Sequence, residues 1–399
     1  MASISPEACA GALLACCLEG RPWRENDLEP LLSGEHGHLL FSVVAEGLAD
    51  RFEPRLCNSY AALFSEVIAR KIEGLHAHHL FERYQRIRKP REFEGDPSRI
   101  RNVFVLSRVT LGADIAVTSV LLDAARRKFP EARVWLVGSL KSWELFSSSS
   151  IGHIPITYRR GGSLESRFGV FEQLREALCQ PSSIILDPDS RLTQLGLLPV
   201  CPEEDYFFFE SRAYGGDSGE TVGLLARRWA CHTFGLDDCE AFLRLSPASG
   251  AAADITVSLG VGENPAKRIA DPFEPQLLRY LGTRGEVLVD KGAGGEEAER
   301  VARAIETSGA RILCWEGSFA GFASHIAQSR LYVGYDSAGG HAAAAAGVPL
   351  VSIFAGFASH RMFERWRPTG KAMSIVLRVD NPNPSEVWEK TRAALDQLL

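Results

Sequence analysis

The sequence LYVGYDSAGGHAAAAAGVPLVSIF, residues 331–354, is the segment of this chain that says most about its fold. An apolar run at 331–335 has the length and composition of a buried strand, and a polar turn at Asp336 and Ser337 follows it. A helix of small residues comes next and ends at Gly347 and Pro349, before a second apolar run at 350–354. Two buried strands joined by a helix form a βαβ unit, so this stretch predicts an α/β fold with a parallel sheet.

The same pattern extends in both directions along the chain. Further strands are expected at 103–106, 134–138, 182–186, 206–210, 255–260, 286–289 and 311–314, with helices at 115–129, 296–305 and 384–399. Residues 246–253 are small or helix-breaking, which is the composition of a linker. We therefore expect two doubly wound, Rossmann-like lobes, 98–245 and 254–399, which face a ligand cleft at the carboxyl ends of their strands.

Residues 1–97 have a different pattern of apolar residues. Apolar residues recur there at helical spacing, as in Leu63, Phe64, Val67 and Ile68, which predicts an α-helical N-terminal region. The apolar stretch 9–17 could suggest a signal peptide, but no Lys or Arg precedes it. Residues 5–7 are instead typical of the N-cap, first-turn proline and acidic first turn of a soluble helix.

Composition limits the classes of protein that remain. The 399 residues, 45% of them apolar, predict two or three soluble domains, and the net charge of −6 gives no electrostatic reason to expect nucleic-acid binding. Nine cysteines without a CxxC pair indicate neither a disulfide framework nor a zinc site, so we expect a cytoplasmic protein. No apolar run is long enough to span a bilayer. Peripheral association with the inner membrane face and a homo-oligomer through the helical region stay open.

The turn at 336–341 has the character of an anion site. Asp336 and Ser337 are expected to cap the helix, and Gly339 and Gly340 would let a ligand approach the backbone. A helix N-terminus at the carboxyl end of a strand suits a phosphate or diphosphate, and His341 could add a donor one turn inside. The alternative is an ordinary capped helix whose glycines serve tight packing.

Residues 258–268, SLGVGENPAKR, form a second candidate segment. They match neither the Walker A pattern nor GxGxxG, so a nucleotide triphosphate hydrolase is not expected. Lys267 leaves a glycine-containing loop and could neutralise a phosphate as a point charge. The alternative is a solvated surface lysine.

Two further residues follow strands in the first lobe. Asp114, after LSRVTLGA at 106–113, is either the N-cap of the next helix or a base that takes a proton from an acceptor hydroxyl. Arg212 is either a residue that grips an acidic acceptor group or a surface arginine in a turn. Glu296 and Glu297 are expected to favour the N-terminus of the helix at 296–305 through its dipole, and the alternative is that they contact a ribose.

Taken together, these segments resemble glycosyltransferase family 9, the heptosyltransferase family of inverting glycosyltransferases with the GT-B fold. The resemblance covers residues from about 102 to the C-terminus. It rests on the following matches: Gly112 and Asp114 in the first strand-to-helix turn, Phe129 and Pro130 after the helix, Lys267, and the signature Asp336, Ser337, His341, Ala344, Gly347 and Pro349.

The resemblance implies a nucleotide diphosphate sugar in the second lobe. Lys267 and the amides of residues 337–340, including Ala338, would hold the diphosphate, His341 would support them, and Asp114 would activate the acceptor. Neither a divalent metal nor a cofactor is implied, because a lysine and a helix N-terminus can stabilise the leaving nucleotide. The chain departs from the family pattern by the insertion of Ala113, by Ala338 in place of a glycine, and by the helical region 1–97.

The expected function is therefore an inverting, metal-independent glycosyltransferase that acts on a glycan, lipid-linked or protein acceptor, in cell-surface glycan or lipopolysaccharide synthesis. The donor base, the sugar and the acceptor are not fixed by these residues. Two alternatives remain, a non-catalytic nucleotide-sugar-binding module and a nucleotide-sugar epimerase of the same fold.

Overall fold

The computed structural model describes residues 5–33, 35–159, 161–248, 253–262, 264–292 and 294–399. Contacts between residues divide the chain into two compact units. Unit 1 comprises 1–110, 120–140 and 151–240, and unit 2 comprises 111–119, 141–150 and 241–399. Each unit contains one parallel sheet with helices on it, which confirms the predicted α/β fold of two doubly wound lobes. The predicted domain boundaries at 97, 245 and 254 stay a prediction.

The sheet of unit 1 has the strand order β3-β2-β1-β4-β5 with all pairs parallel. Its strands are β1 (Asn102–Leu106), β2 (Arg133–Gly138), β3 (Gly152–Pro155), β4 (Ser183–Asp187) and β5 (Tyr206–Phe208). Helices α7 (Ser119–Lys128), α8 (Leu140–Trp143), α9 (Leu164–Phe168), α10 (Val170–Leu178) and α11 (Val222–Phe234) connect or follow them. Four of the five strands were predicted, and β3 was not.

The N-terminal region of unit 1 is helical, as predicted. It contains α1 (Pro6–Glu19), α2 (Glu25–Leu28), a π-helix at Leu40–Ala45, α3 (Glu46–Ala49), α4 (Pro54–Ala69) and α5 (Ala77–Ile87). Ser5 caps α1 by accepting a hydrogen bond from the Ala8 amide at 3.3 Å, which confirms the predicted helix start. Buried residues of these helices, such as Phe64 and Tyr84, belong to one hydrophobic core with Phe208 of the sheet. The helical region is therefore part of the first lobe's core.

The sheet of unit 2 has the order β11-β10-β9-β6-β7-β8, again all parallel. Its strands are β6 (Ile255–Ser258), β7 (Val287–Asp290), β8 (Ile312–Trp315), β9 (Leu331–Tyr335), β10 (Leu350–Phe354) and β11 (Ser374–Arg378). From β6 the chain adds β7 and β8 on one side of the sheet. It then returns to place β9 on the other side of β6, and β10 and β11 follow on that side. The direction of winding thus reverses between β6 and β9, and such a point is where open α/β sheets bind ligands.

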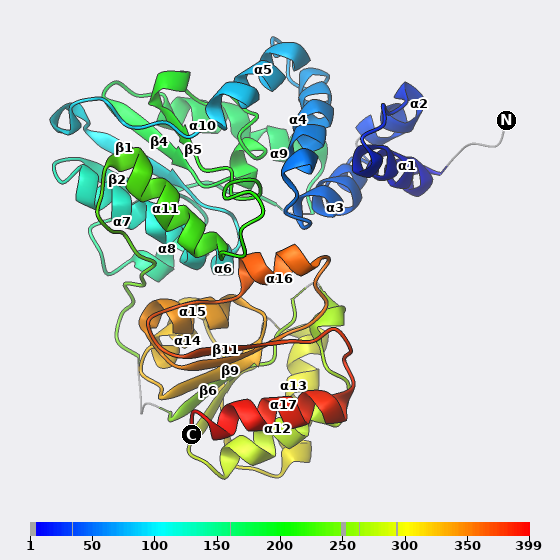
Figure 1. The fold of residues 1–399 in the computed structure, drawn as a ribbon, viewed down its shortest axis with the longest axis vertical. Helices are drawn as coiled ribbons and strands as arrows, with labels where there is room; N and C mark the ends of the chain where they lie inside the picture. Colours follow the sequence, from blue (N-terminus) through cyan, green and yellow to red (C-terminus); the bar gives the residue numbers. More distant parts are fainter. Residues whose placement is uncertain (1–4, 34, 160, 249–252, 263, 293) are drawn as a thin grey trace. The chain divides into compact units, whose positions relative to one another are not determined.

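Helices cover both faces of this second sheet. In Figure 1, α12 (Phe273–Gly282), α13 (Gly295–Ser308) and α17 (Pro384–Asp396) lie together on one face, while α14 (Phe319–Ile326) and α15 (Ala338–Ala346) lie on the other. Helix α16 (His360–Trp366) joins β10 to β11. Within the described residues, no helix is long and apolar enough to cross a membrane.

Candidate functional site

The two central predicted residues follow the strands at which the second sheet reverses. Lys267 ends a 3₁₀ turn at Pro265–Lys267 after β6, and Asp336 follows β9 directly. Because β6 and β9 are neighbours in the sheet, their carboxyl ends bring these two residues together, although 69 positions separate them in the chain. The ammonium Nζ of Lys267 donates to the carboxylate Oδ2 of Asp336 at 2.6 Å and to its main-chain oxygen at 3.1 Å.

This ion pair is largely withdrawn from solvent. The side chain of Lys267 is 19% exposed and that of Asp336 is 10% exposed. A solvated surface lysine, the alternative that the sequence left open, is therefore wrong. An ammonium group has three N–H donors, and Asp336 accepts two of them, so one donor remains for a ligand.

The loop that carries Lys267 rests on the turn after β10. Asn264 accepts a hydrogen bond from the Ala266 amide at 3.1 Å and donates to the main-chain oxygen of Gly356 at 2.9 Å. Gly356 has φ +65°, and a Cβ there would stand 2.6 Å from the carbonyl carbon of Ala266 and 2.8 Å from the nitrogen of Lys267. The backbone of this turn thus fixes the position of residues 264–267, which carry the lysine. No role was predicted for Gly356.

Both flanks of the loop are also held. Glu297 lies in the first turn of α13, as predicted, and it also accepts hydrogen bonds from the amides of Val261 and Gly262 at 2.8 and 3.3 Å, so it anchors the loop after β6. On the other flank Arg268 lies 3.5 Å from Glu274, which is fully buried and also accepts a hydrogen bond from Tyr335. A loop with so many fixed contacts holds its lysine in one place.

The N-terminus of α15 is built on a buried tyrosine. Ser337 occupies the N-cap position with extended backbone, but its side chain makes no capping hydrogen bond and lies 3.2 Å from the hydroxyl of Tyr332. The predicted side-chain cap is therefore wrong, and the first-turn amides of α15 keep their capacity to bind an anion. A Cβ at Gly339 would overlap the ring of Tyr332, so packing alone requires this glycine. Gly340 faces Pro368.

His341 lies one turn inside α15 and is 8% exposed. Burial lowers the pKa of its imidazole, as does the charge of Lys267, while Asp336 opposes the shift. The ring is therefore neutral at neutral pH and can donate one hydrogen bond. It packs edge-on against Trp366 at 6.0 Å between ring centroids. Gly112 belongs to the same unit, and a Cβ there would stand 3.1 Å from Cδ2 of His341.

Asp114 lies inside a continuous helical stretch. The stretch begins with α6 (Leu111–Ala113), continues as a π-helix over Asp114–Thr118 and enters α7. The N-cap interpretation is therefore wrong. Asp114 is fully buried, and its Oδ1 accepts a hydrogen bond from the hydroxyl of Thr118 at 2.7 Å. Its role as a base stays a prediction.

Arg212 was expected to have an exposed guanidinium under both interpretations, and that expectation is wrong. The residue is 3% exposed in unit 1. Its Nε and Nη2 donate to the two carboxylate oxygens of Asp189 at 2.9 and 3.0 Å, and the guanidinium lies over the ring of Tyr60. Because Asp189 follows β4 and Tyr60 lies on α4, this pair ties the helical region to the sheet.

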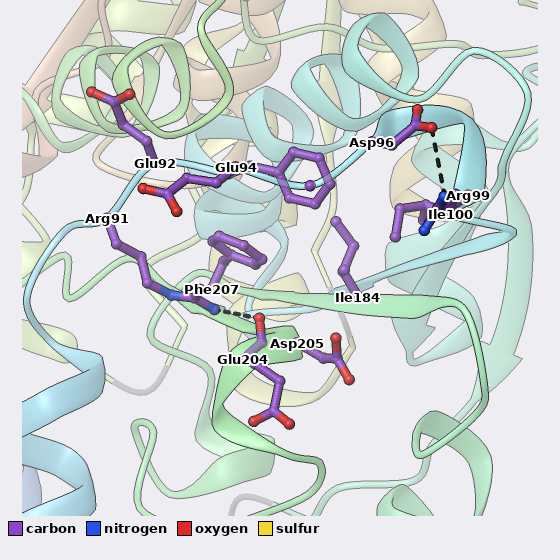
Figure 2. Close-up of a pocket in the computed structure, with 12 residues that line it drawn as sticks. Arg91, Glu92, Glu94, Asp96, Arg99, Ile100, Ile184, Glu204, Asp205 and Phe207 are labelled. Carbon is purple, nitrogen blue, oxygen red and sulfur yellow. Dashed lines mark hydrogen bonds and ion pairs between the residues drawn. The ribbon is translucent and has the colours of Figure 1, made fainter.

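Two hollows lie outside these residues. One, of about 510 Å³ in unit 1, is lined by Phe207, by the start of β4 and by the segment 91–100. Figure 2 shows Arg91 beside Phe207 on one wall of it and carboxylates, including Glu94 and Asp205, around it. It opens at the amino-terminal end of the first sheet. The other, of about 880 Å³ in unit 2, flanks the lysine loop and is lined by α12 and α13. Glu296 and Glu297 line the second hollow, and none of the other predicted site residues lines either one.

The described part of the chain contains no group of three or more His, Cys, Asp or Glu side chains arranged to hold a metal ion. The second unit instead contains a half-buried lysine, a neutral histidine and a helix N-terminus without a side-chain cap. These groups meet where the winding of a parallel sheet reverses. Fold and geometry together define a GT-B-type α/β protein whose second lobe contains a candidate anion site.

Comparisons with known proteins agree with this class. Residues 274–394 match the family model described as glycosyltransferase family 9 (heptosyltransferase). The E. coli heptosyltransferase WaaC with ADP-2-deoxy-2-fluoro heptose is similar, with a TM-score of 0.55 at 14% identity over 74% of this chain and 99% of that one. So is E. coli ADP-heptose lps heptosyltransferase II, with 0.50 at 20% identity over 74% and 99%. A search of curated protein sequences gave no match.

A third similar structure is a glycosyl transferase family 9 protein from Veillonella parvula, with a TM-score of 0.52 at 14% identity over 75% of this chain and 90% of that one. At these identities the structural likeness establishes the fold. The family match over residues 274–394 confirms the predicted resemblance, and the protein is a heptosyltransferase-like glycosyltransferase. The match includes Asp336 and His341, and it begins after Lys267.

Proposed function

We propose that this enzyme transfers a sugar from a nucleotide diphosphate sugar to an acceptor hydroxyl with inversion and without a metal ion. The observation that carries the proposal is the placement of Lys267 beside the N-terminus of α15 at the sheet's reversal point. The third N–H of the lysine and the amides of residues 337–340 bind the diphosphate. His341 donates a further hydrogen bond as a neutral ring.

The same groups supply the catalysis. As the bond to the sugar breaks, negative charge grows on the departing nucleotide diphosphate. A fixed ammonium group and oriented backbone dipoles stabilise that charge without reorganisation, which is the task that a divalent cation performs in other sites. Asp114 takes the proton of the attacking hydroxyl. The reaction is a single displacement, so the sugar carbon inverts.

ADP-heptose is the donor to test first, because a similar fold holds an ADP-heptose analogue in WaaC. The acceptor is a glycan of the lipopolysaccharide type, and the enzyme works in the cytoplasm at the inner membrane face. These assignments extend from the similar structures and rest on the proposed transfer.

The first experiment measures thermal stabilisation of the wild type, Lys267→Ala and the control Lys390→Ala by ADP, GDP, UDP and their sugar conjugates. Lys390 is exposed on α17, so its variant removes the same charge elsewhere in the lobe. Ligand at about one hundred times its dissociation constant adds roughly 2.7 kcal/mol of stability. A shift with one base that is lost only in Lys267→Ala supports the diphosphate site. An equal shift in all three proteins contradicts it.

A second experiment addresses the chemistry. Asp114→Asn keeps the volume of the side chain, and we expect it to lower the transfer rate by about 10²- to 10⁴-fold while ADP binding is unchanged. Transfer should persist in the presence of EDTA. A donor that is isomerised without any acceptor would identify an epimerase, and nucleotide binding without any turnover would identify a binding module.

A further inference from the structure

Two cysteines, Cys231 and Cys239, meet at the end of α11 in unit 1. Cys231 lies in the last turn of the helix and is half-buried, whereas Cys239 lies in the segment that follows and is fully buried. Their sulfur atoms are 3.7 Å apart. Both are free thiols.

The local sequence explains why these thiols touch. Gly235 ends α11 with φ +61°, and the amide of Leu236 then donates to the main-chain oxygen of Cys231 at 3.0 Å, so the chain reverses along the helix. An ion pair of 2.7 Å between Arg227 and Asp238 holds the returning segment in place. The thiol of Cys239 also lies 3.7 Å from the main-chain oxygen of Arg227, one helical turn before Cys231. The contact between the sulfurs is therefore a fixed feature of the turn.

We propose that Cys231 and Cys239 are a site of thiol–disulfide modification whose co-reactant is a low-molecular-weight disulfide such as glutathione disulfide. The thiolate of Cys231 attacks one sulfur of the oxidant, forms a mixed disulfide and releases one thiolate, which takes up the proton that Cys231 had lost. Cys239 then attacks Sγ of Cys231, and its proton passes to the second thiolate that this step releases. Two protein thiols are oxidised to one disulfide, and one disulfide molecule is reduced to two thiols. The sulfurs need to approach by about 1.7 Å to reach a bond length of about 2.05 Å.

The roles of the two thiols follow from their surroundings. Cys231 is the one that solvent reaches, so it meets the oxidant. Burial raises the pKa of the Cys239 thiol, and Cys231 and the carboxylates of Asp123 and Asp238 raise it further, so Cys239 stays protonated until its neighbour has reacted. Unit 1 ends at residue 240, and the chain passes into unit 2 at 241. The disulfide would thus cross-link the last residues of unit 1 to α11.

The test treats the full-length wild-type protein with glutathione disulfide, alkylates the remaining thiols under denaturing conditions and digests with trypsin. No Lys or Arg lies between Trp229 and Arg244, so one tryptic peptide carries both cysteines. We expect this peptide without alkyl groups and lighter by two hydrogens, with the change reversed by dithiothreitol. The exposed Cys179 and Cys314 serve as internal controls, since each should carry glutathione instead.

Two variants locate the chemistry. Cys239→Ala should stop at a stable glutathione adduct on Cys231, and Cys231→Ser should leave Cys239 unreacted until the protein is denatured. Amide exchange of residues 236–240 should slow in the oxidised wild type. The proposal is overturned if Cys231 stays free while Cys179 and Cys314 are modified, or if the wild type accumulates the same Cys231 adduct as Cys239→Ala.

Discussion

The contact between Gly356 and the lysine loop makes a sharp test of how the candidate site is built. Gly356→Ala introduces a Cβ that would lie 2.6 Å from the carbonyl carbon of Ala266 and 2.8 Å from the nitrogen of Lys267. Carbon atoms in contact are about 3.5 to 4.0 Å apart, so the backbone of the loop must move by roughly 1 Å. The glycine also has φ +65°, where a non-glycine residue costs about 1 kcal/mol.

A backbone shift of this size should displace the ammonium group of Lys267. The hydrogen bonds of Lys267 to Asp336 at 2.6 and 3.1 Å leave little room for movement, and the third N–H moves with them. Hydrogen bonds to charged groups contribute about 1.5 to 3 kcal/mol, so misplacing this one should weaken ADP binding by about tenfold to a hundredfold. The assay is titration calorimetry with ADP, beside the free energy of unfolding of each protein.

Gly309→Ala is the matched control. Gly309 ends α13 in the same unit with φ +66°, and a Cβ there would meet nothing within 4 Å. This variant has the same backbone strain without displacing the loop, so it should lose similar stability and keep wild-type affinity for ADP. Equal affinity in both variants would refute the reasoning about the loop. Faster amide exchange at residues 266–267 in Gly356→Ala alone reports the displacement even if ADP is not the ligand.

Two other substitutions test the assignments of charged residues. Arg212→Met leaves the carboxylate of Asp189 buried without its partner, so unit 1 should lose about 3 to 5 kcal/mol in urea unfolding; a loss below about 1 kcal/mol would show that the guanidinium is not buried. Burial lowers the pKa of His341 in the folded protein, so the unfolded chain binds the proton more readily. The stability that the neutral ring contributes is therefore present above about pH 6.5 and is lost as the pH falls below that value. His341→Gln should therefore reduce the slope of melting temperature against pH between about 5 and 7, and an unchanged slope would contradict the assigned burial.

The strands that the sequence predicted are those with continuous apolar runs. β1, β4, β6 and β9 are central in their sheets and nearly fully buried, so their residues have little freedom to be polar. The two strands that were not predicted, β3 and β11, are both edge strands, and most of their residues are only half-buried. An edge position alone does not prevent the prediction, because β8 is also a half-buried edge strand and was predicted from its apolar run. β3 (Gly152–Pro155) contains only one large apolar residue, so it lacks the hydrophobic pattern on which the prediction depends.

Residues proposed to contact a ligand were easier to predict than residues that support them. Lys267 and Asp336 each follow an apolar strand, and the family motif indicated their roles before their pairing was known. Gly356 and Glu297 act through contacts with residues about ninety and about thirty-five positions away, and periodicity contains no information about such partners. Arg212 was misjudged for a related reason: arginine is seldom buried, and only the structure shows the aspartate that makes its burial possible.

The charges of the candidate site explain why its support matters so much. Lys267 and Asp336 cancel as an ion pair, and His341 is neutral, so these three residues present no net charge to a diphosphate. Attraction of the proposed diphosphate must then come from oriented donors. These are one N–H of the fixed ammonium group and the amides at the start of α15, where the helix dipole adds about half a positive charge. Directed donors lose their effect when they are misplaced by an ångström, whereas net charge does not. A site of this kind therefore needs the tyrosine under α15 and the glycine under the lysine loop as much as it needs the lysine.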